Sequence, residues 1–259
     1  MRATQLCRKF RDGSRRLPLR PFHFGYLGGG HDANAADVST KGKLARLLGG
    51  VLLRSARIVD ATDVGGFRRL VLRTDAPRAA AGTKLQLLLP SDDMRTYSPV
   101  ASAEGVVLLG WRHAGGPGAR WLAEATTGMD VRFVGPQRSL DLPPGPVIVV
   151  GDETSVAVAA SYETERPGQI RTVLGAGSVD DVRSAAESVG LRSLEVLPRG
   201  AIEPLVEATA AASAATPGAT IALTGGSELV LAVRRGLRGR GIRRVTTKAY
   251  WVPGKRGLD

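Results

Sequence analysis

Four consecutive residues, Arg95-Thr96-Tyr97-Ser98, carry side chains that suit a planar ligand with a phosphate group. The surrounding stretch has the composition of a β-strand, whose alternation places Arg95 and Tyr97 on one face and the two hydroxyls on the other. A guanidinium can clamp a phosphate, a phenol ring can lie on a flavin, and a hydroxyl can hydrogen-bond a ring nitrogen. The motif therefore predicts a flavin site. A half-buried strand with an exposed arginine is the alternative.

A second motif is a glycine-rich loop that runs into a helix. Its candidate binding residues are His113, Gly116, Pro117, Gly118, Ala119 and Trp121. Proline is tolerated in a first helical turn, and the free N–H groups of that turn attract a diphosphate. The loop predicts a diphosphate site, unless it is only a turn with a helix cap.

A third motif, Gly151-Asp152-Glu153-Thr154, follows an apolar run and begins another helix. Asp152 or Thr154 can cap that helix by accepting a hydrogen bond from one of its first N–H groups. The motif is either a well-capped helix or a ligand site beyond the end of a strand.

Near the end of the chain, Tyr250-Trp251 stands in a basic segment. Residues 234–256 hold nine Lys and Arg with no acidic residue between them: Arg234, Arg235, Arg238, Arg240, Arg243, Arg244, Lys248, Lys255 and Arg256. This run indicates either a solvated helix face or an anion-binding surface.

We expect residues 51–145 to form a barrel. Short β-rich runs occupy residues 51–59, 67–74, 83–89, 94–100, 106–111 and 131–134, with one helix at 117–125. Six strands at this spacing predict a closed antiparallel β-barrel. The Pro143-Pro144-Gly145-Pro146 cluster is typical of a stiff linker, which would end this domain.

We expect residues 146–259 to form a second domain. Strand-like runs at 147–150, 170–174, 193–197, 219–223 and 243–251 alternate with helical ones at 154–164, 179–189, 203–215 and 227–240. This βαβ order predicts a Rossmann-like parallel sheet with helices on both faces. Such sheets bind ligands beyond the carboxyl ends of their strands, so we expect chemistry after residues 150, 174, 197 and 223.

The net charge of +12 is concentrated at the amino terminus. Residues 1–58 hold 12 Lys and Arg against 3 Asp and Glu, whereas the remaining residues hold 24 against 21. We expect residues 1–50 to be a flexible basic extension and expect no specific nucleic-acid site. With the single cysteine Cys7 and no apolar run of about 20 residues, a cytoplasmic protein outside the membrane is expected. The spacing of three histidines and one cysteine predicts no protein-bound metal.

The order of these motifs resembles the siderophore-interacting protein family, the FAD-dependent ferric-siderophore reductases of the ferredoxin-reductase-like superfamily. The family pattern runs Arg-x-Tyr-Thr, then His with Gly-Pro-Ala-Ser-x-Trp, then Gly-Pro-x-Gly-Ser, then Gly-Asp-Glu-Thr, and finally Tyr-Trp. This chain supplies corresponding elements in that order from about residue 52 to residue 254. The resemblance implies an FAD-binding barrel and a domain that binds NADPH or NADH as electron donor.

The resemblance also implies a role for each barrel motif. Arg95 would bind the FAD phosphate, Tyr97 would pack on the flavin, and Ser98 would stand near the reactive nitrogen. The glycine-rich loop with His113 would hold the diphosphate, and Trp121 would pack behind it.

In the second domain, residues Gly151 to Thr154 would form the base of the nicotinamide site. The catalytic candidates are Ser98 from the barrel motif and Thr154. Tyr250-Trp251 would close the cavity near the flavin. The candidate substrate-binding residues are Lys248, Tyr250, Trp251, Lys255 and Arg256.

The implied activity passes electrons from NAD(P)H through FAD to a ferric siderophore or another ferric chelate. The oxygen donors of such chelates bind ferrous ion far less tightly, so reduction releases the iron. The chain departs from the family pattern, with Val100 in place of a frequent Arg and Ser155-Val156-Ala157 in place of Ala-Leu-Pro. Two alternatives therefore stay open: a non-catalytic flavin-binding scaffold, and a basic module that binds polyanions.

Overall fold

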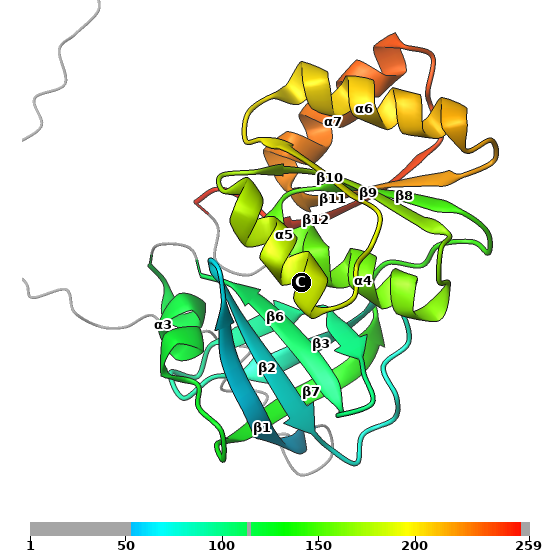
Figure 1. Cartoon of the computed structure of the whole chain (residues 1–259). Helices are drawn as coiled ribbons and strands as arrows, with labels where there is room; N and C mark the ends of the chain where they lie inside the picture. Colours follow the sequence, from blue (N-terminus) through cyan, green and yellow to red (C-terminus); the bar gives the residue numbers. More distant parts are fainter. Residues whose placement is uncertain (1–52, 113–114, 255–259) are drawn as a thin grey trace, which may run out of the picture. The chain divides into compact units, whose positions relative to one another are not determined.

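The computed structural model describes residues 53–112 and 115–254 (Figure 1). The amino-terminal sheet consists of β1 (Arg54–Val64), β2 (Phe67–Arg73), β3 (Thr83–Leu88), β4 (Met94–Tyr97), β5 (Pro99–Ala101), β6 (Val106–Trp111) and β7 (Asp130–Arg138). Its strands pair antiparallel in the order β4-β3-β7-β1-β2-β6-β5. Because the two edge strands β4 and β5 are consecutive in the chain, the sheet curls into the predicted barrel. Helix α3 (Pro117–Glu124) joins β6 to β7.

The prediction of six barrel strands is wrong by one, because residues 94–100 do not form a single strand. The β4 part pairs with β3, whereas the β5 part pairs with β6. The chain leaves the ladder at Ser98, and Pro99, which has no N–H to donate, begins the next strand. The break places Ser98 between two strands, inside the predicted flavin motif.

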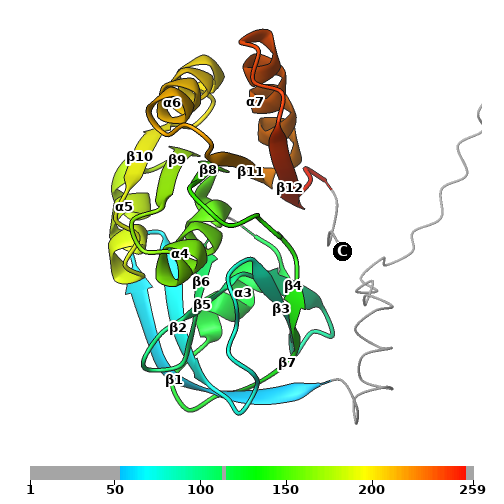
Figure 2. The same cartoon turned by 90° about the vertical axis from the view of Figure 1, so that its right-hand side faces the viewer.

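The second sheet is parallel and confirms the predicted Rossmann-like architecture. Its strands are β8 (Val147–Gly151), β9 (Ile170–Ala176), β10 (Leu194–Pro198), β11 (Thr220–Gly226) and β12 (Val245–Trp251), in the order β10-β9-β8-β11-β12. The connecting helices are η1 (Glu153–Ser155), α4 (Val156–Glu165), α5 (Val179–Ser188), α6 (Ile202–Ala215) and α7 (Ser227–Gly239). Helices α4 and α5 cover one face of the sheet, and α6 and α7 cover the other (Figures 1 and 2).

The burial of these elements follows their sequence pattern. All five residues of β8 are buried, as expected of a central parallel strand with helices on both faces. Helix α7 buries Val230, Val233 and Leu237, which recur at helical spacing on one side. Helix α4 has no such polar side, because residues 156–163 are all buried.

Helix α4 lies between the two sheets (Figure 1), and its polar groups bond to the barrel. The Tyr162 hydroxyl donates to the carbonyl oxygen of Leu140 at 2.6 Å, and the Ala81 N–H donates to Glu165 Oε2 at 2.7 Å. One hydrophobic core continues from barrel residues such as Phe67 into this helix and the parallel sheet.

The strand order of the parallel sheet reverses between β8 and β11. In open α/β sheets, ligands bind at such a reversal, outside the carboxyl ends of the strands. The loops after these two strands are therefore the part of the fold to inspect first.

Candidate functional site

The structure brings Arg95 alongside the first turn of α3. A methyl group at Gly118 would lie 3.4 Å from Cγ and Cδ of Arg95. The guanidinium donates to the carbonyl oxygen of Met94 at 2.7 Å and lies 3.5 Å from Asp93 Oδ1. A cationic side chain thus lies beside the amino-terminal turn of a helix, and both features favour a diphosphate.

The glycine-rich loop leaves open space at this end of α3. Gly116 is the N-cap with φ of 90°, Pro117 begins the helix, and no side chain caps it. Within residues 53–112 and 115–254, and apart from the chain neighbours, no atom lies within 4 Å of where a Cβ would stand at Gly115 or Gly116. Free N–H groups, open space and a nearby guanidinium fit the diphosphate of FAD. The predicted residue His113 lies outside the described residues.

Tyr97 and Trp121 form the aromatic part of the site. Their ring centroids are 6.2 Å apart with an interplanar angle of 49°. Burial raises the pKa of the Tyr97 phenol above its ordinary value, which the charge of Arg95 partly offsets. Trp121 is buried in the barrel core, where its ring lies beside that of Tyr97. Thr96 is exposed on the opposite face of the strand.

Ser98 and Tyr250, from opposite halves of the chain, come together. Burial raises the pKa of Tyr250 above its ordinary value, and a side-chain hydrogen bond with Ser98 partly offsets that rise. The gap between β4 and β5 exposes Ser98 to this contact. The predicted catalytic residue Ser98 and the predicted substrate-binding residue Tyr250 therefore lie beside each other.

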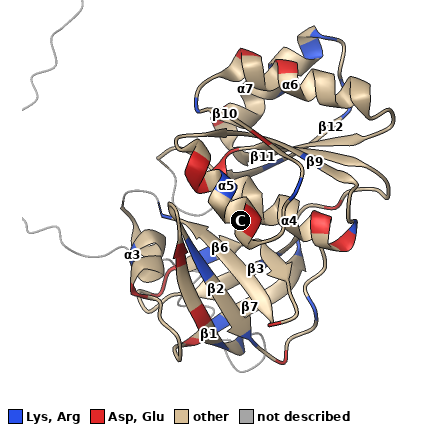
Figure 3. Cartoon of the chain, viewed as in Figure 1, with Lys and Arg blue, Asp and Glu red and all other residues tan. Residues whose placement is uncertain are grey.

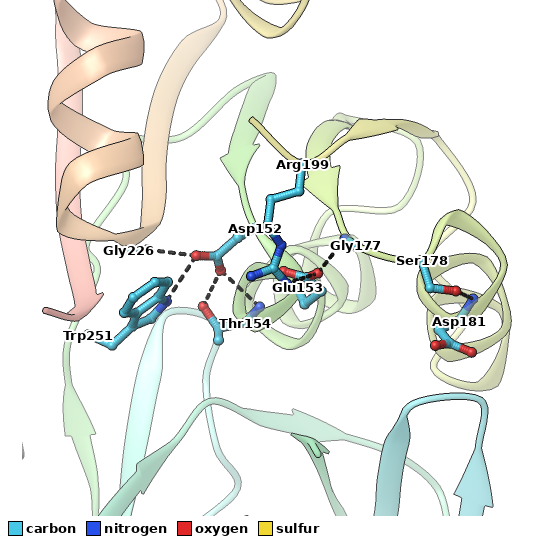
Figure 4. Close-up of polar contacts among 9 residues, drawn as sticks. All are labelled: Asp152, Glu153, Thr154, Gly177, Ser178, Asp181, Arg199, Gly226 and Trp251. Atoms are coloured by element: carbon cyan, nitrogen blue, oxygen red, sulfur yellow. Dashed lines mark hydrogen bonds and ion pairs between the residues drawn. The ribbon is translucent and has the colours of Figure 1, made fainter. Parts of the chain in front are cut away.

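Asp152 is the polar centre at the carboxyl ends of β8 and β11. Its Oδ1 accepts hydrogen bonds from the N–H and the hydroxyl of Thr154, and its Oδ2 accepts from Gly226 N at 2.7 Å and from Trp251 Nε1 at 2.9 Å (Figure 4). The side chain is 5% exposed. Asp152 thereby joins η1 to β11 and β12, and the Thr154 hydroxyl is engaged with it.

Trp251 lies against the backbone of Gly226. A methyl group at Gly226 would stand 2.6 Å from the indole ring. At Gly225, where φ is +101°, a methyl group would stand 2.6 Å from the Asp152 carboxylate. Only glycine fits at either position, because the Asp152 carboxylate and the Trp251 ring occupy the space that side chains would need. The reversal point between β8 and β11 is thus partly covered by an indole.

Glu153 points away from Asp152, toward the end of β9 (Figure 4). Its Oε1 accepts from Gly177 N at 2.8 Å and from Arg199 Nη2 at 2.5 Å, and the side chain is 4% exposed. The Arg199 guanidinium also lies 4.9 Å from the ring centroid of Trp111, on barrel strand β6. A buried carboxylate and a cation therefore meet beside the barrel, where β8, β9 and β10 end.

The sequence motifs did not single out Arg199. Its position directly after β10, at the same edge of a parallel sheet as Gly151, was the available signal. Gly151 itself is confined, because a methyl group there would stand 2.1 Å from Ser155 Oγ.

The arginines of the basic run that lie on α7 and before β12, from Arg234 to Arg244, do not converge on this site. Arg234, Arg235 and Arg238 are exposed on the second half of α7, and Arg240 pairs with Glu203. These residues precede β12, whereas the site lies at its carboxyl end. Lys248, opposite Thr224 in the strand register, is half-buried; Lys255 and Arg256 lie outside the described residues.

Two further observations apply to residues 53–112 and 115–254. No three His, Cys, Asp or Glu side chains there come close enough together to share a metal ion. None of the helices in this part of the chain has both the length and the apolar character for a membrane crossing.

No protein-family model and no curated protein matches the chain. Solved structures do match. The siderophore-interacting protein SipS from Aeromonas hydrophila has a TM-score of 0.62 at 22% identity, over 79% of this chain and 93% of that chain. A siderophore utilization protein from T. fusca has a TM-score of 0.58 at 18% identity, over 80% and 95%. The chain has the fold of the siderophore-interacting proteins.

This fold extends to reductases with other partners. The Amycolatopsis cytochrome P450 reductase GcoB has a TM-score of 0.60 at 23% identity, over 78% of this chain and 71% of that chain. The expected likeness to the siderophore-interacting proteins within the ferredoxin-reductase type is confirmed at the level of the fold.

Proposed function

We propose that the protein is an FAD-dependent oxidoreductase that passes electrons from NADPH or NADH to a ferric siderophore or another ferric chelate. The observation that carries the proposal is the position of Arg95 and Tyr97, which lie against helix α3 in a barrel that is followed by a parallel sheet with a strand-order reversal between β8 and β11. A flavin on the barrel motif would then face a nucleotide at the strand ends. The names of the structural neighbours, which include siderophore-interacting proteins and reductases, support the same class.

The barrel residues would hold FAD. Arg95 and the N–H groups of Gly116, Gly118 and Ala119 bind the diphosphate, because the Arg95 side chain lies beside the first turn of α3 and Pro117 has no N–H to donate. Tyr97, backed by Trp121, packs on the ring system, and Ser98 hydrogen-bonds near its reactive edge. FAD, when bound, accepts two electrons from a nicotinamide and releases them singly.

The α/β residues would hold the nicotinamide dinucleotide. Glu153 and Arg199 offer an acceptor and a cation beyond β8, β9 and β10, where the ribose and phosphate groups of a dinucleotide bind in this type of sheet. Gly151 to Thr154 form the floor near the nicotinamide. The buried Asp152 holds Trp251 in place rather than offering a free oxygen to the ligand.

The ferric chelate would bind where Tyr250 and Trp251 meet the flavin motif. Trp251 is 38% exposed and offers an aromatic face to a ligand. Lys248, together with Lys255 and Arg256, would attract anionic chelates to this end of β12. We further propose that residues 1–50 form a separate extension, residues 51–145 the flavin domain and residues 146–259 the nucleotide domain.

A non-catalytic flavin-binding scaffold is the second candidate, and one observation favours it. Trp251 covers Gly226 at the strand reversal, where a nucleotide must bind. A scaffold would bind FAD yet have no productive position for a nicotinamide.

Absorbance spectra of the purified protein test the proposal. We expect a flavin spectrum that bleaches when NADPH or NADH is added without oxygen. A ferric chelate added next should restore the flavin absorbance and yield ferrous ion, measured with a colorimetric ferrous chelator. A flavin spectrum that neither nucleotide bleaches would support the scaffold. A colourless protein that does not take up added FAD would overturn both candidates.

A further inference from the structure

Asp63, at the end of β1, connects to both ends of the chain segment that carries the glycine-rich loop. Its Oδ2 lies 3.2 Å from Arg112 Nη1, directly before the loop. Its Oδ1 lies 2.8 Å from Arg68 Nη1. Arg68 in turn donates from Nη2 to the carbonyl oxygen of Ala125 at 2.6 Å, at the C-cap of α3. One carboxylate thus links the entry of the loop to the end of the helix that follows it.

Both arginine partners of Asp63 make a second contact, whereas the Asp63 side chain itself is 53% exposed. The Arg68 side chain is 14% exposed, and Arg112 also donates to the carbonyl oxygen of Gly65 at 3.0 Å. Gly65 packs against α5, because a methyl group there would stand 2.7 Å from Asp181 Oδ1. The two arginines hold the pKa of Asp63 below its ordinary value, with the Arg68 hydrogen bond as the largest cause. Asp63 therefore connects the β1–β2 hairpin, through Arg68 and Arg112, to both ends of the segment between β6 and β7.

Gly115 and Gly116 belong to the described part of the loop and have positive φ values. Apart from their chain neighbours, no atom of the described residues lies within 4 Å of where their Cβ atoms would stand. The apolar contacts are made further along, where Leu122 fills the space above Gly110 and would meet any side chain there at 2.5 Å. Among the described residues, the polar contacts that hold this segment lie at its two ends, at Arg112 and Ala125.

We propose that Asp63 is a positioning residue for the flavin diphosphate site, acting through Arg112 and Arg68. This inference rests on the proposed function, since it assumes that the loop binds FAD. Acidic and basic residues lie intermixed on β1 and β2 (Figure 3). The charge pattern alone therefore does not distinguish Asp63 from the other acidic residues of these strands. What separates Asp63 from its neighbours is that both of its oxygens are bonded to arginines that hold the loop segment.

The sign of the effect distinguishes positioning from simple electrostatics. Asp63→Asn removes a negative charge close to a site for a negatively charged diphosphate. Electrostatics alone therefore predicts tighter FAD binding by the variant. Loss of positioning predicts weaker FAD binding, because Arg112 and the loop lose their common anchor.

The experiment compares FAD with riboflavin, which has the flavin ring and no phosphate. The dissociation constants of both for the apoprotein are measured by flavin fluorescence, with thermal unfolding as the check on folding. For Asp63→Asn we expect the FAD constant to rise about tenfold and the riboflavin constant to change less than about twofold. Asp63→Glu should recover part of the FAD affinity. The matched control is Asp60→Asn, on the same strand and paired with Arg69 at 3.1 Å, which should change neither constant.

Unchanged or tighter FAD binding by a folded Asp63→Asn protein would overturn the inference and leave the proposed function intact. Equal losses for FAD and riboflavin would also overturn it, because they would show general damage to the barrel. A parent protein that binds neither flavin would overturn the proposed function, and this inference with it.

Discussion

Trp251 Nε1 donates a hydrogen bond to Asp152 Oδ2 at 2.9 Å, which ties the last strand of the sheet to the turn after its first strand. The same oxygen accepts from the N–H of Gly226, so the indole, the carboxylate and the β11 backbone form one unit. The Asp152 carboxylate is nearly inaccessible to water, which makes each of these bonds costly to lose. This unit determines where the indole stands beside Tyr250.

A double-mutant cycle tests the Asp152–Trp251 unit. Asp152→Asn should lower the free energy of unfolding by about 1.5–3 kcal/mol, and Trp251→Phe by about 1 kcal/mol, because each removes bonds to a buried charged group. The double variant should lose about 1 kcal/mol less than the sum of the two single losses. Urea unfolding of the four proteins measures this. Additive losses would show that the two side chains are not coupled.

Gly226→Ala tests the position of the indole. The new methyl group would stand 2.6 Å from the ring, so Trp251 must move. We expect a shift of the tryptophan emission and at least a tenfold change in the rate at which NAD(P)H bleaches the flavin, with FAD affinity unchanged. Gly239→Ala is the control, because no described residue outside the adjoining turns of α7 has an atom within 4 Å of its Cβ position. If the emission shifts and the bleaching rate does not change, Trp251 has no part in the reaction with NAD(P)H.

Arg95→Ala tests the flavin clamp. Loss of a charge-assisted contact of about 1.5–3 kcal/mol should weaken FAD binding about ten- to a hundredfold. Arg132→Ala, which removes an exposed arginine elsewhere on the barrel, is the matched control and should have no effect. Fluorescence titration with FAD measures both variants. Equal FAD affinity of the folded Arg95→Ala variant and the parent would remove the clamp from the proposed site.

Glu153→Gln tests the ion pair beside the barrel. The substitution leaves Arg199 without its carboxylate partner and weakens the bond to Gly177 N. We expect the KM for the nicotinamide nucleotide to rise about tenfold while FAD stays bound, since the proposed contact is to the nucleotide. Glu203→Gln breaks an exposed pair with Arg240 and should leave KM unchanged. A changed kcat with an unchanged KM would place Glu153 in a different role.

The sequence pattern predicted most strands and helices of the fold, but it did not predict the side-chain contacts of the site. The βαβ alternation predicted the parallel sheet and hence the edge where Asp152, Gly177, Arg199 and Gly226 meet. Periodicity is a local property, so it identifies strands and their order without showing which side chains turn toward each other. The Trp251–Asp152 bond joins residues from two strand ends and depends on the final position of both.

The break at Ser98 shows the same limit within the barrel. Residues 94–100 have the composition of one strand, and Pro99 alone does not settle whether the strand ends. The outcome depends on the pairing of β4 with β3 and of β5 with β6, which are long-range contacts. Asp63 was missed for a similar reason, because its two arginine partners become a link to the loop only in the folded barrel.

Tyr162 makes the attachment of α4 to the barrel weaken at alkaline pH. Its hydroxyl donates to the carbonyl oxygen of Leu140, and the Arg166 guanidinium lies 5.2 Å from the ring centroid. Burial raises the pKa of Tyr162 to about 12, against the opposing effect of the Arg166 charge. An unfolded tyrosine ionises near pH 10, so the fold favours the neutral phenol. The stability from this group is therefore complete below about pH 10 and is lost as the pH rises from about 10 to about 12.

Tyr162→Phe should lower the free energy of unfolding by about 1 kcal/mol at pH 7, because the Leu140 carbonyl loses its donor. The phenylalanine cannot ionise, so the advantage of the parent should shrink as the pH rises above about 10 and should reverse by about pH 12, because a rise of about 2 in pKa corresponds to more than about 1 kcal/mol. The contribution of Tyr97, whose pKa burial also raises, cancels in the difference because it titrates in both proteins. That of Tyr250 cancels only in part, because the charge of Tyr162 adds to the rise of its pKa. Urea unfolding at pH 7, 10 and 11.5 measures that difference. A constant difference across the series would show that the Tyr162 phenol is not held neutral by its burial against the barrel.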